Sequence, residues 1–149
     1  MSALAVAAWP AEDHSATRLL HVDPARNAFH DGLVSDLTPL AVAAVERARG
    51  AGGRVVAVGT TVVRALEGAW RDGGLRALVA TTDLRIGPGF EPRVVSGLLT
   101  GLHEPGESHF ELLQAFAARA LLEAAVAHAA AAGYRGHEFG DASLVLAGG

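Results

Sequence analysis

Apolar and polar residues follow one another along the chain in two patterns, which predict two kinds of element. Short β-branched and aliphatic runs predict strands, and apolar residues spaced three or four positions apart predict helices. Because the strands alternate with helices, we expect an α/β fold with mostly parallel strand pairing. The predicted strands are residues 18–22, 54–58, 82–86, 93–100 and 142–146, and the predicted helices begin near residues 38, 61 and 108.

Local signals define the ends of several predicted helices. Thr38-Pro39 combines an N-cap threonine with a proline at the first helical position, and the glycines of residues 50–53 end that helix. Ser108 to Glu111 has the spacing of a capping box, which predicts a long amphipathic helix reaching about Ala132. Gly133 is the expected stop of this helix.

Two segments fit more than one arrangement. Residues 27–33 could pair with residues 18–22 as a hairpin across Pro24 to Asn27, and residues 75–80 fit neither pattern well. No internal repeat and no long linker divides the sequence, so we expect residues 1–149 to form a single α/β domain.

Composition narrows the class of protein. Of the 149 residues, 50% are hydrophobic and 19% are charged, which is typical of a globular chain. The absence of cysteine excludes disulfides, thiolate metal sites and cysteine nucleophiles, and agrees with an expected cytoplasmic location. The net charge is −4 and every basic residue is an arginine, so no broad basic face for nucleic acid is expected. We expect neither a signal peptide nor a membrane span.

A metal site is not expected either. His14, His21, His30 and His128 show no ligand spacing, and none of them pairs with another at the i, i+4 step that helical metal sites use.

The segment Arg54 to Arg64 carries the first candidate site. A strand ends at Gly59, Thr60 and Thr61 follow, and a helical pattern begins at once. Free backbone N–H groups and the helix dipole at such a turn favour anionic or polar ligands, and Arg64 is one helical turn further on. The alternative is a threonine-capped helix with an arginine paired on its surface.

Other candidates lie at predicted strand ends. Thr82-Asp83 could hold a ligand hydroxyl, or could close a turn through an Asx-type bond. His103 precedes Pro105 at the end of an apolar strand, where it could transfer protons or bond a turn carbonyl. His109 could be a second acid–base group, or simply a residue of the first turn of the next helix.

Gly140 and Asp141 precede the last predicted strand. Gly140 permits a tight or positive-φ turn, and Asp141 could accept hydrogen bonds from a substrate or from a neighbouring helix N-terminus.

Four ordered pieces of the chain resemble one enzyme family, the S-adenosylmethionine:tRNA ribosyltransferase-isomerases of queuosine biosynthesis. The pieces are residues 52–67, 82–89, 94–105 and 134–144, and residues 10–37 are more weakly similar to the family's opening segment. On this resemblance, residues 1–37 match the family's N-terminal segment and residues 38–149 its C-terminal half. The family's middle section, with its small β-barrel domain, is absent, so we expect a partial or compact barrel-like α/β domain.

The resemblance implies a reaction on S-adenosylmethionine as substrate, without a metal or prosthetic group. The ribosyl group moves to the aminomethyl group of a 7-deazaguanine base in tRNA, and adenine and methionine are released. On this basis the expected catalytic residues are His103 and Asp141, and the expected substrate-binding residues are Gly59, Thr60, Thr61, Arg64, Thr82, Asp83 and Glu138.

One motif departs from the family pattern. Where the family enzymes more often have His-Leu-Pro-Lys-Ser-Thr, this chain has the sequence His-Glu-Pro-Gly-Glu-Ser from His103 to Ser108. A basic residue is lost and two glutamates are gained, which disfavours a phosphate backbone at this point. The acceptor therefore need not be tRNA.

Two further hypotheses compete with an active enzyme. The chain could be a non-catalytic remnant or partner subunit, or a small module that binds adenosyl ligands. An incomplete barrel would expose strand edges and apolar surface, so a homo-oligomer or a complementary chain is a natural expectation.

Overall fold

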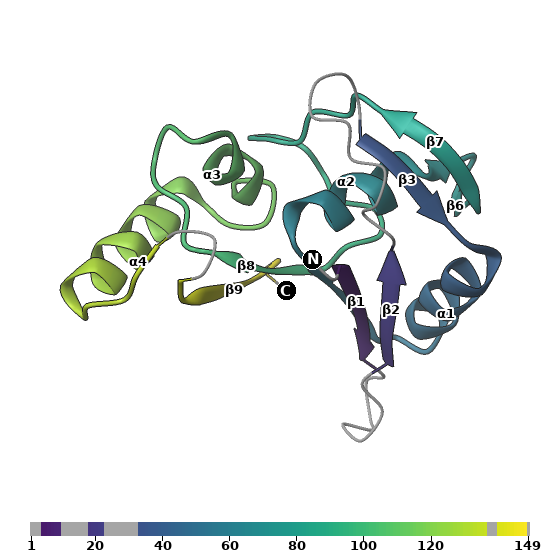
Figure 1. The fold of residues 1–149 in the computed structure, drawn as a ribbon, viewed down its shortest axis with the longest axis horizontal. Coiled ribbons are helices and arrows are strands. Elements are labelled where there is room, and N and C mark those ends of the chain that lie inside the picture. The colour runs from purple at the N-terminus through teal and green to yellow at the C-terminus, as the bar shows by residue number, and fades with distance from the viewer. Residues whose placement is uncertain (1–3, 10–17, 23–32, 137–139, 149) are drawn as a thin grey trace.

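The computed structural model describes residues 4–9, 18–22, 33–136 and 140–148. Its main feature is a five-stranded sheet in the order β2-β1-β4-β8-β9 (Figure 1). The bounds of these strands are β1 Leu4–Trp9, β2 Arg18–Val22, β4 Arg54–Val58, β8 Gly97–Gly101 and β9 Ala142–Leu146.

The fold is α/β as predicted, but the expectation of mostly parallel pairing is wrong. Among the described strands only β4 and β8 pair in parallel, and every other pair is antiparallel. The sequence pattern misses this because β1 and β2 follow each other without a helix, and because two helices, which reverse the chain twice, separate β8 from β9. The described sheet is an open sheet, and a barrel is not confirmed.

Two shorter pairs of strands accompany the sheet. β3 (Leu33–Leu37) pairs with β7 (Leu78–Thr82), and β5 (Trp70–Arg71) pairs with β6 (Gly74–Leu75). The strand predicted at residues 18–22 is confirmed, but its partner is the preceding strand β1, and most of the alternative partner, residues 27–33, lies outside the described residues.

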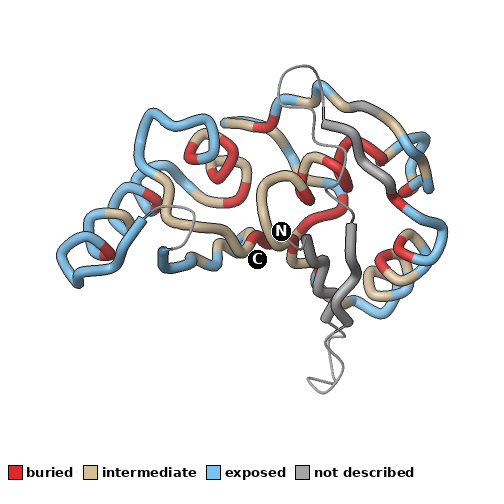
Figure 2. The backbone as a smooth tube through the Cα atoms, viewed as in Figure 1, coloured by how far each residue is buried: buried red, intermediate tan, exposed pale blue. Residues whose placement is uncertain are grey.

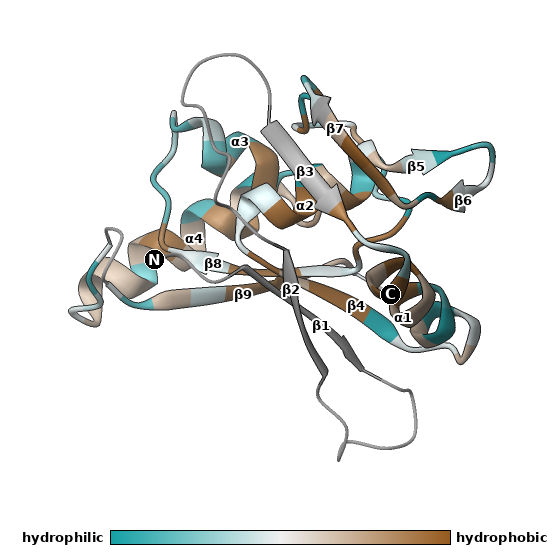
Figure 3. Cartoon of the chain, turned by 45° about the vertical axis from the view of Figure 1, so that its right-hand side comes forward, coloured by the Kyte–Doolittle hydropathy of each residue, from teal (hydrophilic) through white to brown (hydrophobic). Residues whose placement is uncertain are grey.

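The core lies on one face of the sheet. Figure 3 shows α2, α3 and the β3–β7 pair on the same side of the five strands, and Figure 2 shows the buried backbone concentrated there. Val55, Ala57 and Leu98 point to this face and are buried, together with Phe110 and Leu66 from the helices. On the opposite face, Leu144 and Leu146 of β9 keep 57% and 39% of their surface exposed.

Helix α1 (Pro39–Gly50) begins as the sequence predicts. Thr38 is its N-cap, and the Thr38 hydroxyl accepts the backbone N–H of Ala41 at 3.2 Å. Helix α2 (Thr60–Gly68) follows β4 directly, and its buried face carries Val62, Val63 and Leu66. Both helices therefore bury an apolar stripe against the strands.

The predicted long helix from Ser108 to Ala132 is wrong as a single element. It is divided into α3 (Ser108–Leu113) and α4 (Arg119–Ala131), and α3 has no side-chain cap, so the capping-box prediction is wrong as well. A tight turn between them, closed by the bond from Phe116 N–H to the Leu113 carbonyl, buries Phe116 in the core. Burial of this ring outweighs continuation of the helix.

Two strand predictions need correction. The strand predicted at residues 82–86 is wrong, since the observed strand β7 ends at Thr82 and residues 83–86 have no regular structure. The strand expected from residue 93 begins only at Gly97, since the backbone amides of residues 93–95 bond to a side chain described below. The described part of the chain has no helix that is both long and apolar enough to cross a membrane.

Candidate functional site

The carboxyl ends of β4 and β8 lie side by side, because the two strands are parallel. Val58 pairs with Leu99, and the backbone N–H of Gly59 then donates to the Leu99 carbonyl at 2.8 Å. The Gly59-Thr60-Thr61 turn at the end of β4 is thus brought next to the end of β8, which leads to His103. Ligands of open α/β sheets commonly bind at such carboxyl ends.

Gly59 is the N-cap of α2, and no side chain caps this helix N-terminus. The φ angle of Gly59 is 90°, a left-handed conformation that favours glycine. Thr60 and Thr61 are partly exposed. Since the threonines are inside the helix, the alternative prediction of a threonine-capped helix is wrong, and the first N–H groups of α2 remain open to a polar ligand.

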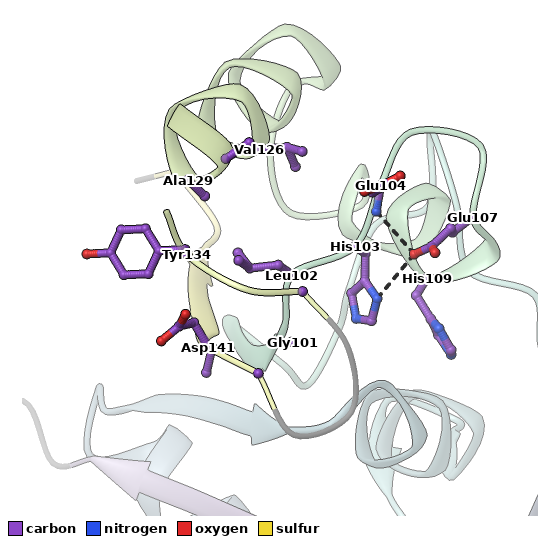
Figure 4. Close-up of a pocket in the computed structure, with 14 residues that line it drawn as sticks. Gly101, Leu102, His103, Glu104, Glu107, His109, Val126, Ala129, Tyr134 and Asp141 are labelled. Atoms are coloured by element: carbon purple, nitrogen blue, oxygen red, sulfur yellow. Dashed lines mark hydrogen bonds and ion pairs between the residues drawn. The ribbon is translucent and has the colours of Figure 1, made fainter. Parts of the chain in front are cut away.

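A pocket of about 820 Å³ opens beyond the end of β8 (Figure 4). It is formed by the segment of residues 101–109, by α4, and by the loop that precedes β9. Among the described residues, its charged lining residues are Glu104, Glu107 and Asp141, and none is an arginine. The described residues that line it are Gly101, Leu102, His103, Glu104, Glu107, His109, Val126, Ala129, Ala130, Tyr134, Gly136, Gly140, Asp141 and Ala142.

His103 is held on both sides of its ring. Its Nε2 is hydrogen-bonded to Thr100 Oγ1 at 2.9 Å, and its Nδ1 lies 3.6 Å from Glu107 Oε2. The ring of His109 lies 4.8 Å away between centroids, tilted by 40°. Burial and the neighbouring charge of His109 lower the pKa of His103, while the carboxylate of Glu107 opposes that shift.

Asp141 closes the loop at the other side of the pocket. Its Oδ2 accepts the backbone N–H of Arg135 at 2.8 Å, and its own N–H donates to the Arg135 carbonyl at 2.8 Å. A side chain on Gly140 would collide with that same carbonyl, so glycine is required there. In Figure 4, Tyr134 and Asp141 lie on the opposite side of Leu102 from the two histidines.

Arg64, Thr82 and Asp83 form a separate group beside α2. Arg64 Nε donates to the Leu84 carbonyl at 3.1 Å, and Thr82 Oγ1 accepts the Leu84 backbone N–H at 3.2 Å. Asp83 is exposed. None of these three residues lines the pocket, and neither do Gly59, Thr60 and Thr61. The predicted site residues therefore form two groups: His103 and Asp141 line the pocket, and the others that the structure describes lie outside it. Glu138 lies outside the described residues.

The sequence model of a family described as "Queuosine biosynthesis protein" matches residues 34–145, which is most of the chain. The chain belongs to this queuosine biosynthesis family. The resemblance seen in the sequence is thereby confirmed, and both groups of site residues lie within the matched region.

Several proteins similar to this chain are named S-adenosylmethionine:tRNA ribosyltransferase-isomerase. One from Methylobacterium sp. strain 4-46 is 47% identical over 112 residues, which are 74% of this chain and 31% of that protein. One from Thermosynechococcus vestitus is 41% identical over 125 residues, which are 82% of this chain and 35% of that protein. The chain spans about a third of the length of these curated relatives.

A solved structure supports the same relationship. The crystal structure of S-adenosylmethionine tRNA ribosyltransferase from Thermotoga maritima has a TM-score of 0.69 with this chain and is 38% identical in sequence. The similarity covers 74% of this chain and 39% of that one.

Glu67 is a further residue of this family member that the sequence analysis did not single out. Its side chain is buried at 5% exposure, and its carboxylate accepts the backbone N–H groups of Arg93, Val94 and Val95 at 2.9, 3.0 and 2.8 Å. The available signal was a lone acidic residue on the otherwise apolar buried face of α2. Glu67 fixes the segment that enters β8 and so supports the site indirectly.

The described residues show no cluster of three or more His, Asp or Glu side chains placed to hold a metal ion. The pocket instead offers two imidazoles, two glutamates, an aspartate and a tyrosine. Such a lining can transfer protons and can bind a cationic or hydrogen-bonding group.

Proposed function

We propose that this chain forms part of a site that transfers the ribosyl group of S-adenosylmethionine to an amine acceptor. The acceptor is a 7-deazaguanine-type base in tRNA, and adenine and methionine are released. The observation that carries the proposal is the adjacency of two features at the β4 and β8 carboxyl ends: the uncapped α2 N-terminus and the histidine-lined pocket. The relatives' names supply the reaction class.

The Gly59-Thr60-Thr61 turn is the proposed binding end for S-adenosylmethionine. Its open N–H groups and threonine hydroxyls suit ribose hydroxyls or the methionine carboxylate. Arg64 donates Nε to the Leu84 carbonyl, so it also holds the Thr82-Asp83 segment beside the helix. Glu138 is retained as a binding residue on the resemblance alone.

The end of the pocket near His103 is the proposed acid–base end. The sulfonium of S-adenosylmethionine acidifies the neighbouring C–H group, and the acceptor amine must lose a proton when it forms a bond to carbon. The proposal assigns this proton exchange to His103 and His109, which both line the pocket with their ring centroids 4.8 Å apart. Asp141 contributes by closing the loop that forms the far wall of the pocket.

A second candidate is a chain that binds S-adenosylmethionine but turns it over only with further polypeptide. The observation in its favour is the exposure of Leu144 and Leu146 on the face of β9 that points away from the core, in a chain that spans about a third of its relatives. In that case binding is retained and adenine release requires an added partner.

The test is calorimetric titration with S-adenosylmethionine together with chromatographic detection of adenine. Arg64→Ala should weaken binding about tenfold or more if Arg64 makes a charge-assisted hydrogen bond to the ligand. The matched control is Arg76→Ala, which removes an exposed arginine from the β6–β7 connection. Neither heat nor adenine from the wild-type protein would overturn both candidates, and heat without adenine would favour the second.

A further inference from the structure

We propose that His109, rather than His103, exchanges the proton with the substrate, and that His103 is a positioning residue behind it. This inference rests on the proposed function and assigns roles within its acid–base end. It is carried by the hydrogen-bonding state of the two rings.

Both ring nitrogens of His103 are already engaged. Nδ1 faces the carboxylate of Glu107 at 3.6 Å, which favours a proton on Nδ1. In neutral His103 the other nitrogen, Nε2, then accepts the hydroxyl proton of Thr100 at 2.9 Å. Only 17% of the His103 side chain is exposed. A substrate could reach its basic nitrogen only after displacing Thr100.

His109 has the opposite properties. It is the second residue of α3, its side chain is exposed, and it lines the pocket. Within the described part of the chain its ring is in contact with His103 and makes no hydrogen bond. Figure 4 shows the two rings side by side, with Glu107 Oε2 within ion-pair distance of His103 Nδ1. The nitrogens of His109 are therefore free for a substrate.

The proton balance of the amine step suits this arrangement. As the acceptor nitrogen bonds to the ribosyl carbon, it loses one proton to His109 and keeps the electron pair. Adenine leaves with the electrons of its bond to the sugar and takes that proton from the imidazolium. No oxidant or co-reactant is needed.

Several titratable groups surround the His103–His109 pair. Glu107 and Glu104 precede α3, His103 follows β8, and Tyr134 and Asp141 face the same pocket from the loop before β9. The 101–109 segment thus places two carboxylates in the same pocket as His109.

The decisive experiment is adenine release by His109→Ala with and without added imidazole. We expect the rate constant to fall about 100-fold or more, as general acid–base groups contribute on this scale, and imidazole to restore part of it because the position is exposed. His128→Asn, which changes an exposed histidine of α4 that does not line the pocket, is the matched control and should retain wild-type activity.

The positioning role of His103 has its own readouts. His103→Asn should reduce the rate less than His109→Ala and should not be rescued by imidazole. Relative to the wild-type protein, the Glu107→Gln variant should have a lower His103 pKa and the His109→Asn variant a higher one, as followed by NMR of the ring protons.

Each outcome decides between the residues. A His109→Ala variant with wild-type activity, or rescue by imidazole in a His103 variant but not in a His109 variant, would overturn the assignment. If the wild-type protein binds S-adenosylmethionine but releases no adenine under any condition, this assignment fails while binding survives. If it does not bind at all, the proposed function fails as well.

Discussion

Among the residues that the structure describes, Glu67 should be the most costly polar side chain to remove. Its buried carboxylate is the acceptor for three backbone amides, those of Arg93, Val94 and Val95. A hydrogen bond to a charged group contributes about 1.5–3 kcal/mol, and a buried donor left without a partner costs about 1–3 kcal/mol. Since water can partly replace the lost acceptor, we expect Glu67→Ala to lower the free energy of unfolding by about 3–5 kcal/mol.

That loss is comparable with the whole stability of many domains, about 5–15 kcal/mol, so a milder variant is needed. Glu67→Gln keeps one acceptor oxygen, which can serve Val94 and Val95 as Oε1 does, but turns an NH₂ group toward the Arg93 N–H. One donor then loses its partner. We expect a loss of about 1–3 kcal/mol for this variant.

Urea unfolding followed by circular dichroism would measure both effects, with an unchanged slope showing that the states compared are the same. The control is Glu91→Gln, an exposed carboxylate in the same segment, which should change stability by less than about 0.5 kcal/mol. A Glu67→Gln variant as stable as that control would refute the reasoning.

Three further predictions concern other parts of the chain. Thr38→Ala removes the cap of α1 and should cost about 1 kcal/mol in thermal or urea unfolding. A Cβ on Gly97 would lie 2.6 Å from Cδ2 of the partly exposed Leu146, which can rotate away, and 3.2 Å from the Val145 carbonyl oxygen; Gly97→Ala should therefore destabilise the protein by about 1 kcal/mol, and adding Leu146→Ala should recover part of the loss. Because the pKa of His103 is below its ordinary 6.5, the unfolded chain binds more protons below pH 6.5. The contribution of neutral His103 to the free energy of unfolding is therefore full above that pH, and it is lost as the pH falls through the pKa of His103 in the folded protein. Equal pH profiles for wild type and His103→Gln, measured by urea unfolding between pH 5 and 8, would contradict this.

Local signals in the sequence predicted the elements whose ends they control. The cap at Thr38, the strand at residues 54–58 and the stop at Gly133, whose φ is 80°, are confirmed because each depends on a few adjacent residues. The break between α3 and α4 was not predictable in the same way. It depends on Phe116 finding space in the core, which is a property of the packed fold.

The candidate site likewise has features that the sequence predicts and features that depend on the packed fold. The sequence brought His103 and the Gly59-Thr60-Thr61 turn into consideration because each follows a strand, and parallel pairing of those strands makes them neighbours. It could not show that Thr100 and Glu107 occupy the ring nitrogens of His103, because those contacts depend on side-chain directions. Strand ends predict a region, whereas hydrogen-bond partners decide the role of a residue within it.

Helix α2 fixes the position of the Gly59-Thr60-Thr61 turn relative to His103, because both ends of this helix are hydrogen-bonded to β8 or to the residues that lead into it. At its start, the Gly59 N–H donates to Leu99, and near its end Glu67 accepts from Val95. With both ends fixed, the turn that carries Thr60 and Thr61 has little freedom to move relative to the strand that leads to His103. Binding geometry of this kind is sensitive to displacements of about 1 Å. A Glu67→Gln variant that stays folded should therefore bind S-adenosylmethionine more weakly than Glu91→Gln, although neither side chain touches the proposed site.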